Sequence, residues 1–161
     1  MYDVIPVCQY LAWRSYGRGC EPLTNLRLQK ILYYMTLVFL AYMKEPCFSN
    51  KMEAWDLGPT VPKAYRTYAK YGAGEIPGER TLAMEVISPE HRKAMNELMD
   101  ALDAYTTDQL IMISKSHSPW KKNYVNYDTH EIPLSDLISF VKESVDDIVK
   151  MKEYLGRVAH D

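Results

Sequence analysis

The chain has 161 residues, of which 47% are hydrophobic and 25% charged, and its net charge is −2. This length is typical of one domain that buries a sizeable core, so we expect a single helical domain over residues 1–161. The near-zero net charge gives no electrostatic basis for binding nucleic acid or an anionic membrane. Three cysteines without a C-x-x-C spacing and an N-terminus without a secretory pattern favour a reducing cytoplasm.

The first predicted element is a helix over residues 2–16, ended by Gly17. A longer helix is then predicted from Thr24 to Lys44, with Thr24 as N-cap. Its apolar positions recur every three or four residues, at Leu28, Ile31, Leu32, Met35, Val38, Phe39 and Tyr42. A second apolar set surrounds this face, which indicates a buried helix at the centre of the fold. The apolar run at 31–43 is shorter than the roughly 20 residues that a membrane span needs.

An extended segment is expected near Trp55, followed by a turn at Gly58-Pro59. Pro62 suits the first turn of a short helix that ends at Gly72. Residues 72–88 are expected to form an exposed, mobile loop with a short extended piece at 82–87, because glycines and charges are frequent there.

Three further helix starts are indicated at Ser88, Thr106 and Ser118, the second by a capping box with Gln109. Ser135 opens a last helix that reaches Gly156, and residues 144–161 are predicted to be a C-terminal helical extension. The fold class that follows is all-α: about seven helices around the central one, with a small extended element near Trp55.

The sequence carries little sign of catalysis or of a metal. Its four histidines and three cysteines form no short-spaced ligand pairs, so we expect neither a metal nor a cofactor. A pair of Cys47 or Cys20 with His117 is conceivable, but no nucleophile or phosphate-loop motif accompanies it. We therefore expect no enzymatic activity.

One basic cluster offers a candidate nucleic-acid site. Lys115, Lys121 and Lys122 flank His117 and Trp120, and an aromatic ring in such a cluster can stack on a base. The same cluster could be extended by Arg14, Arg18, Arg27 and Lys30 if the first two helices pack beside it. A solvated basic face, with His117 and Trp120 in packing roles, is the interpretation we prefer.

Three segments, taken together, resemble a known family. They are LTNLRLQKILYY at residues 23–34, EAWDLGPTVPKAY at 53–65 and HSPW at 117–120. In this order they are similar to the motifs of the Panacea domain, the family of phage-associated GepA-like and SocA-like proteins. Arg27, Thr60 and Ser116 depart mildly from the family pattern, and the resemblance extends over about residues 2–141.

The resemblance implies an antitoxin that is encoded beside a toxin and neutralises it by direct protein binding. It also leaves open a proteolytic adaptor, which would deliver a partner to a bacterial protease, and a regulator that binds nucleic acid. The motif residues are expected to be structural: Leu28, Trp55, Gly58, Pro59, Pro62, His117, Pro119 and Trp120. Four residues expected at the surface are the candidate contacts with the toxin: Gln29, Lys30, Tyr33 and Tyr65.

Overall fold

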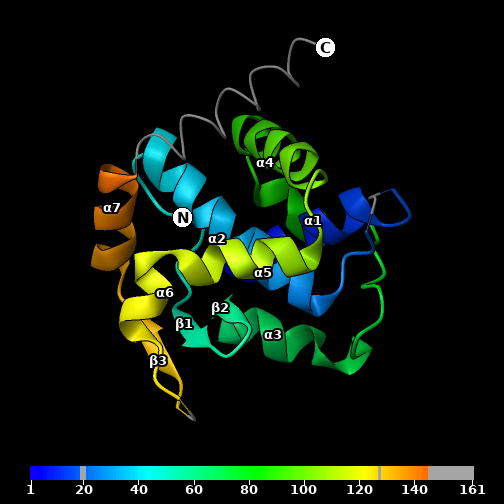
Figure 1. The fold of residues 1–161 in the computed structure, drawn as a ribbon. Coiled ribbons are helices and arrows are strands. Elements are labelled where there is room, and N and C mark those ends of the chain that lie inside the picture. The colour runs from blue at the N-terminus through cyan, green and yellow to red at the C-terminus, as the bar shows by residue number, and fades with distance from the viewer. Residues whose placement is uncertain (19–20, 127, 145–161) are drawn as a thin grey trace.

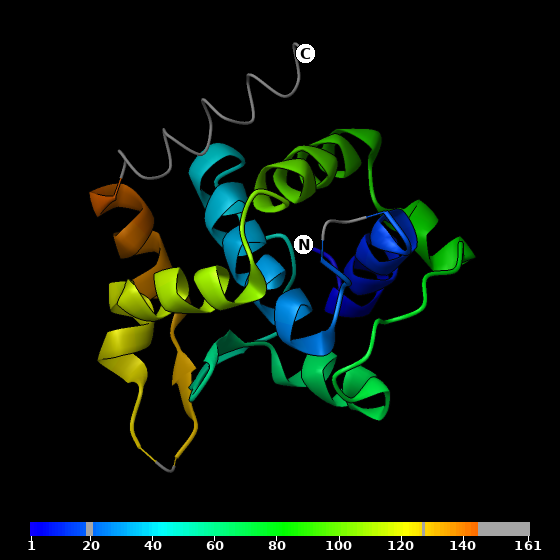
Figure 2. The same cartoon turned by 45° about the vertical axis from the view of Figure 1, so that its right-hand side comes forward.

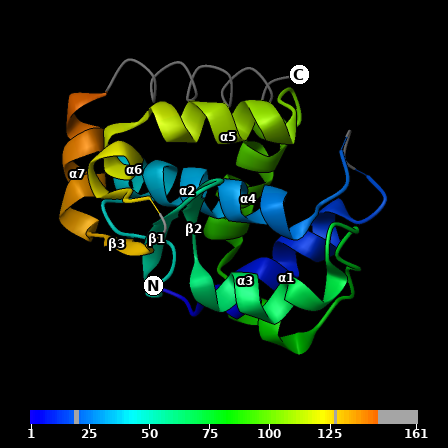
Figure 3. The same cartoon turned by 60° about the horizontal axis from the view of Figure 1, so that its bottom comes forward.

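The computed structural model describes residues 1–18, 21–126 and 128–144. The helix α2 (Asn25–Tyr42) lies at the centre, with the other helices around it in all three views (Figures 1, 2 and 3). Every residue from Leu28 to Leu40 is buried. The hydroxyl of Thr24 accepts a hydrogen bond from the backbone N–H of Arg27 at 3.2 Å. The predicted central helix and its N-cap are therefore confirmed.

The first helix, α1 (Val4–Ser15), begins at Asp3, whose carboxylate accepts a hydrogen bond from the Ile5 backbone N–H at 2.9 Å. It packs against α3 (Pro62–Tyr68) and a 3₁₀ helix, η2 (Leu82–Val86). A second 3₁₀ turn, η1 (Ala69–Tyr71), follows α3.

A small sheet accompanies the helices, so the fold is mainly helical and the all-α expectation is corrected. Strands β1 (Met52–Trp55), β2 (Gly58–Thr60) and β3 (His130–Ile132) are antiparallel in the order β2-β1-β3. The hairpin β1–β2 is the extended element expected near Trp55. The sequence analysis missed β3 because it has three residues, of which two are exposed, too few to show an alternating pattern.

The segment 72–88 is exposed over most of its length, as expected, but not throughout. Its short extended piece is instead the 3₁₀ helix η2, and Ile76, Met84 and Ile87 are buried. The backbone N–H of Ile76 also donates to the Leu23 carbonyl at 2.8 Å. Three buried apolar side chains thus attach this segment to the core.

The second half of the described chain contains α4 (Pro89–Leu102), α5 (Thr107–Ser116), α6 (Ser118–Asn123) and α7 (Leu134–Glu143). The Ser88 cap and the capping box of Thr106 with Gln109 are present as predicted. With β2 and α3, helices α4, α5 and α7 pack against α2. The predicted C-terminal extension, apart from Ser144, lies outside the described residues.

No helix in the described part of the chain has both the length and the apolar character that a membrane crossing requires.

The core predicts a contrast between two methionines that both lie in helices. Met95 is fully buried in α4, whereas Met112 on α5 is 71% exposed. Replacing Met95 with alanine leaves a cavity, and we expect the free energy of unfolding to fall by about 2–5 kcal/mol. The control Met112→Ala should change it by no more than about 0.5 kcal/mol. Urea denaturation measures both, and equal losses would contradict this core.

Candidate functional site

Polar side chains of the first turns of α2 are buried. Gln29, Lys30 and Tyr33 are 1%, 0% and 0% exposed, so the expectation that they lie at the surface is wrong. Asn25 and Arg27 on the same turns are also buried. Burial of such groups is costly unless each is hydrogen-bonded, and in the described chain no buried side-chain nitrogen or oxygen is left unpaired.

Gln29 connects α2 to the start of α3. Its side-chain oxygen accepts a hydrogen bond from the Val61 backbone N–H at 2.9 Å, and its amide nitrogen donates to Asn25 Oδ1 at 2.9 Å. Asn25 in turn donates to the Tyr65 carbonyl at 3.0 Å. This chain of hydrogen bonds fixes the position of α3, and of the Tyr65 backbone, relative to α2.

Lys30 connects α2 to the hairpin. Its ammonium group donates to the Pro59 carbonyl at 2.6 Å, beneath the strand β2. Gly58 is needed here, because its φ is +104° and a Cβ atom would lie 2.8 Å from Lys30 Nζ. Burial, together with the positive charge of Lys115, lowers the pKa of Lys30 to about 7.

Arg27 joins α2 to the region where α4 ends and α5 begins. Its guanidinium donates to the carbonyls of Leu102 at 2.9 Å and Tyr105 at 3.0 Å. It also contacts the Glu21 carboxylate at 3.3 Å, which accepts from the Thr107 hydroxyl at 2.6 Å. Neither Arg27 nor Lys30 therefore extends a basic surface, and that expectation is wrong.

The buried Tyr33 contacts His117, which is partly buried. The Tyr33 hydroxyl and His117 Nδ1 share a hydrogen bond of 2.8 Å, and the His117 ring packs on Phe140 at 4.5 Å between centroids. Burial raises the pKa of Tyr33 well above its usual value. His117, at the junction of α5 and α6, thus links α2 to α7.

Trp120 is covered on its faces by neighbouring side chains. Tyr124 stacks on it with 4.4 Å between centroids, and the Lys115 ammonium lies 4.9 Å from its ring centre. Its indole N–H donates to the Trp55 carbonyl at 2.8 Å. Lys122 is paired with Asp136 at 3.2 Å. These contacts leave the tryptophan little surface on which a base could stack.

The remaining motif residues also face inward. Leu28, Gly58, Pro59, Pro62 and Pro119 are buried, and Trp55 is partly buried. This placement agrees with the structural roles expected for them.

Cysteine chemistry has no evident place in this arrangement. Cys8 and Cys47 are free and buried, and burial raises the pKa of Cys47 to about 12. A thiol that stays protonated is a poor nucleophile and a poor metal ligand. Cys20 lies outside the described residues.

Among the described residues, no group of three histidine, cysteine or acidic side chains could hold a metal ion.

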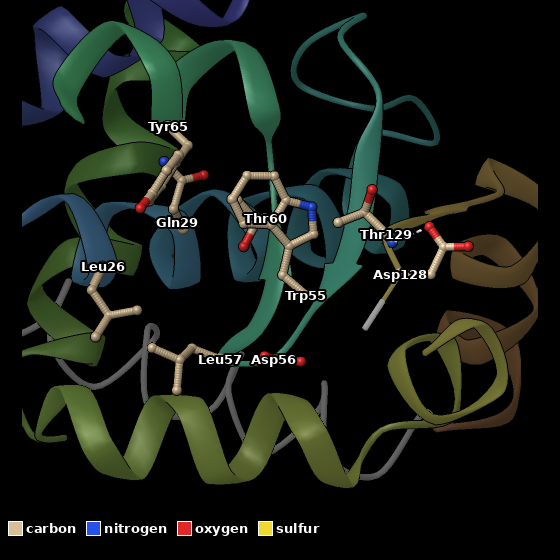
Figure 4. A pocket seen from close by; sticks show the side chains of 9 residues that line it. All are labelled: Leu26, Gln29, Trp55, Asp56, Leu57, Thr60, Tyr65, Asp128 and Thr129. Atoms are coloured by element: carbon tan, nitrogen blue, oxygen red, sulfur yellow. Dashed lines mark hydrogen bonds between the residues drawn. The ribbon is translucent and has the colours of Figure 1, made fainter. Parts of the chain in front are cut away.

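A surface groove of about 410 Å³ lies over the buried polar residues (Figure 4). Its lining consists of Leu26, Gln29, Trp55, Asp56, Leu57, Thr60, Tyr65, Asp128 and Thr129. The rings of Trp55 and Tyr65 meet edge to face, with 4.9 Å between their centroids. Leu57 and Tyr65 are 54% and 39% exposed. Tyr65 is therefore the one residue of the four predicted contacts that lies at the surface.

The groove includes residues that the sequence analysis did not select. Leu57 occupies the two-residue turn between β1 and β2, where polar residues and glycine are usual, and this exception was a usable signal. Asp56 precedes it in the same turn. Asp128 and Thr129 come from the segment before β3, and no local pattern could have placed them beside the hairpin.

The pKa of Lys30 predicts a pH-dependent stability. Between pH 7 and about pH 9 the unfolded chain keeps the Lys30 proton, while the folded protein releases it, so folding is favoured as pH rises. We expect the stability of the wild type relative to Lys30→Met to grow by roughly 1 kcal/mol per pH unit in this range. Urea denaturation of both proteins at each pH measures the difference. A difference that stays constant would mean that the folded protein does not depress this pKa.

Comparison with known proteins identifies the family of this chain. The pattern of the family described as antitoxin SocA-like, Panacea domain, matches residues 28–121. These residues run from the first turn of α2 to the start of α6 and include the hairpin, α3, α4 and α5. Antitoxin SocA of Caulobacter vibrioides (strain NA1000 / CB15N) is 27% identical over 111 residues, covering 62% of this chain and 58% of that protein. No solved structure matches the chain. With more than half of its length matched, the chain belongs to the SocA-like family of the Panacea domain.

Proposed function

We propose that the protein is an antitoxin that neutralises a cognate protein toxin by direct binding and performs no catalysis itself. The observation that carries this proposal is the family match over residues 28–121, together with a relative named as an antitoxin. Because the match to that relative covers 58% of its length, the activity of the relative as a whole is not transferred without a test.

The groove is the surface that best fits protein binding. Leu57 and Tyr65 expose apolar surface beside Trp55, and exposed aromatic and aliphatic side chains over a rigid base are typical of interface centres. The base is rigid because Gln29 and Lys30 hold the backbone beneath it. Binding then requires little ordering of the antitoxin, which lowers its entropic cost.

The other functions considered receive less support. Nucleic-acid binding would use basic side chains, yet Arg27 and Lys30 are buried and Trp120 is covered. We expect the protein to act in the cytoplasm, where the free thiols of Cys8 and Cys47 would stay reduced.

Neutralisation should depend on Leu57. We expect Leu57→Asp to abolish protection when the protein is co-expressed with the product of the adjacent gene, and to weaken binding by ~30-fold or more. The control is Leu82→Asp on η2, because Leu82 is 89% exposed and does not line the groove. Growth assays and titration calorimetry provide the two readouts.

Two results would count against this proposal. If the adjacent gene product is harmless alone, no toxin partner is supported. If Leu57→Asp protects as well as Leu82→Asp, the groove does not bind the toxin.

A second experiment separates direct binding from proteolytic delivery. Purified antitoxin, added to the purified toxin without any protease, should inhibit it at a stoichiometric ratio. If inhibition occurs only in cells, and toxin half-life lengthens when the antitoxin gene is deleted, the protein is a proteolytic adaptor instead.

A further inference from the structure

We propose that the groove binds a cationic side chain of the toxin, best an arginine, with an apolar neighbour of that arginine on Leu57 and Tyr65. This inference rests on the proposed function and specifies the chemistry of the partner segment. Three features support it: the division of the groove into apolar and acidic parts, the local lack of compensating charge, and the aromatic ring between the two parts.

The groove has two chemically different parts. In Figure 4, Leu26 and Tyr65 lie at one end, and Asp128 lies at the other with Trp55 between them. Asp56 lies beside Leu57 in the hairpin turn. An apolar side chain of the partner suits the first end, while the carboxylates of Asp56, next to Leu57, and of Asp128, at the other end, require a polar or charged partner.

No lysine or arginine among the described residues pairs with Asp56 or Asp128, which make up the acidic part of the groove. None of the nine lining residues is basic. Within the described residues Asp56 forms no ion pair, although Asp100 and Asp136 are each paired with an arginine or a lysine. Asp128 contacts His130 Nε2 at 3.2 Å. The field at this end therefore favours a cation.

Both carboxylates are also held in place. The Tyr124 hydroxyl donates to Asp56 Oδ1, and the Thr129 backbone N–H donates to Asp128 Oδ1 at 2.8 Å. A carboxylate has about four acceptor positions, so each keeps sites for a further donor. Fixed carboxylates with open acceptor positions match the planar donors of a guanidinium group.

The ring of Trp55 favours arginine over a cation without a planar group. Trp55 lies between the apolar and acidic parts, and a guanidinium group that reaches the carboxylates would pass beside it (Figure 4). Tryptophan is the side chain with the strongest cation–π attraction, and arginine is its most frequent partner. A phosphate-bearing ligand, in contrast, would be repelled by Asp56 and Asp128.

The test uses the full-length protein and the purified product of the adjacent gene. We expect Asp56→Asn and Asp128→Asn each to weaken binding by about 5- to 10-fold, and the double variant D56K/D128K by ~100-fold or more. The loss should be largest at low salt, because charges at an exposed site are screened as salt rises. The control E45K makes one of these charge reversals at exposed Glu45, beyond the other end of α2 and outside the groove lining.

A complementary experiment identifies the toxin residue. Overlapping peptides that cover the toxin are screened against the wild type and D56K/D128K. Peptides that bind only the wild type should contain an arginine next to an apolar residue. Replacing that arginine with glutamate in the toxin should abolish binding to the wild type and restore part of it with D56K/D128K.

The outcomes distinguish this inference from the proposed function. If D56K/D128K binds the toxin within about twofold of the wild type while Leu57→Asp does not, the inference is wrong and the antitoxin proposal stands. If the wild type neither binds nor neutralises the gene product, both are wrong. If the wild type alone sediments as a dimer that D56K/D128K dissociates, a second copy of this chain occupies the groove, which also overturns the inference.

Discussion

The buried hydrogen bonds of Gln29 and Lys30 are the interactions on which the rest of the structure depends. They run from the centre of the fold to the Pro59 carbonyl in β2 and to the Val61 N–H, which lies between the hairpin and α3. Water does not compete for these groups, and a buried partner left unsatisfied costs about 1–3 kcal/mol. The hairpin has short strands and α3 has seven residues, so neither would be stable without such anchoring. The positions of Leu57 and Tyr65, and with them the groove, follow from this anchoring.

The residues that hold the backbone beneath the groove differ from those proposed to contact the partner. The polar motif residues of α2 point inward and bind backbone atoms, so their partners do not depend on the side chains of the hairpin turn or of α3. Asp56, Leu57, Tyr65 and Asp128 face outward from this fixed base. Substitution of an outward residue changes the groove chemistry while the backbone beneath it is held.

Sequence reasoning predicted the features that depend on local rules. The apolar period of α2 and the capping box at Thr106 each have a local signal, and both are present. The turn expected at Gly58-Pro59 lies instead at Asp56-Leu57, and Gly58 and Pro59 begin β2. Gln29 and Lys30 are expected at the surface because polar residues in a helix usually face water, whereas their hydrogen-bond partners, Val61 and Pro59, lie about 30 residues away along the chain. Local sequence patterns also do not predict that β3 and Asp128 lie beside the hairpin, because only the tertiary structure brings them there. The groove therefore follows from the structure, and of the four predicted contact residues Gln29 and Tyr65 line it.

Amide hydrogen exchange in Gln29→Met tests most directly whether the buried polar residues hold the hairpin and α3. Methionine keeps the size and apolar stem of glutamine but cannot accept the Val61 hydrogen bond. We expect the amides of Val61 and of α3 to exchange about 10- to 100-fold faster than in the wild type, because one buried hydrogen bond is lost. The amides in the middle of α4, around Leu98, should exchange at an unchanged rate. Unchanged protection at Val61 and in α3 would show that packing alone positions the hairpin and α3, and would contradict the central role given to Gln29.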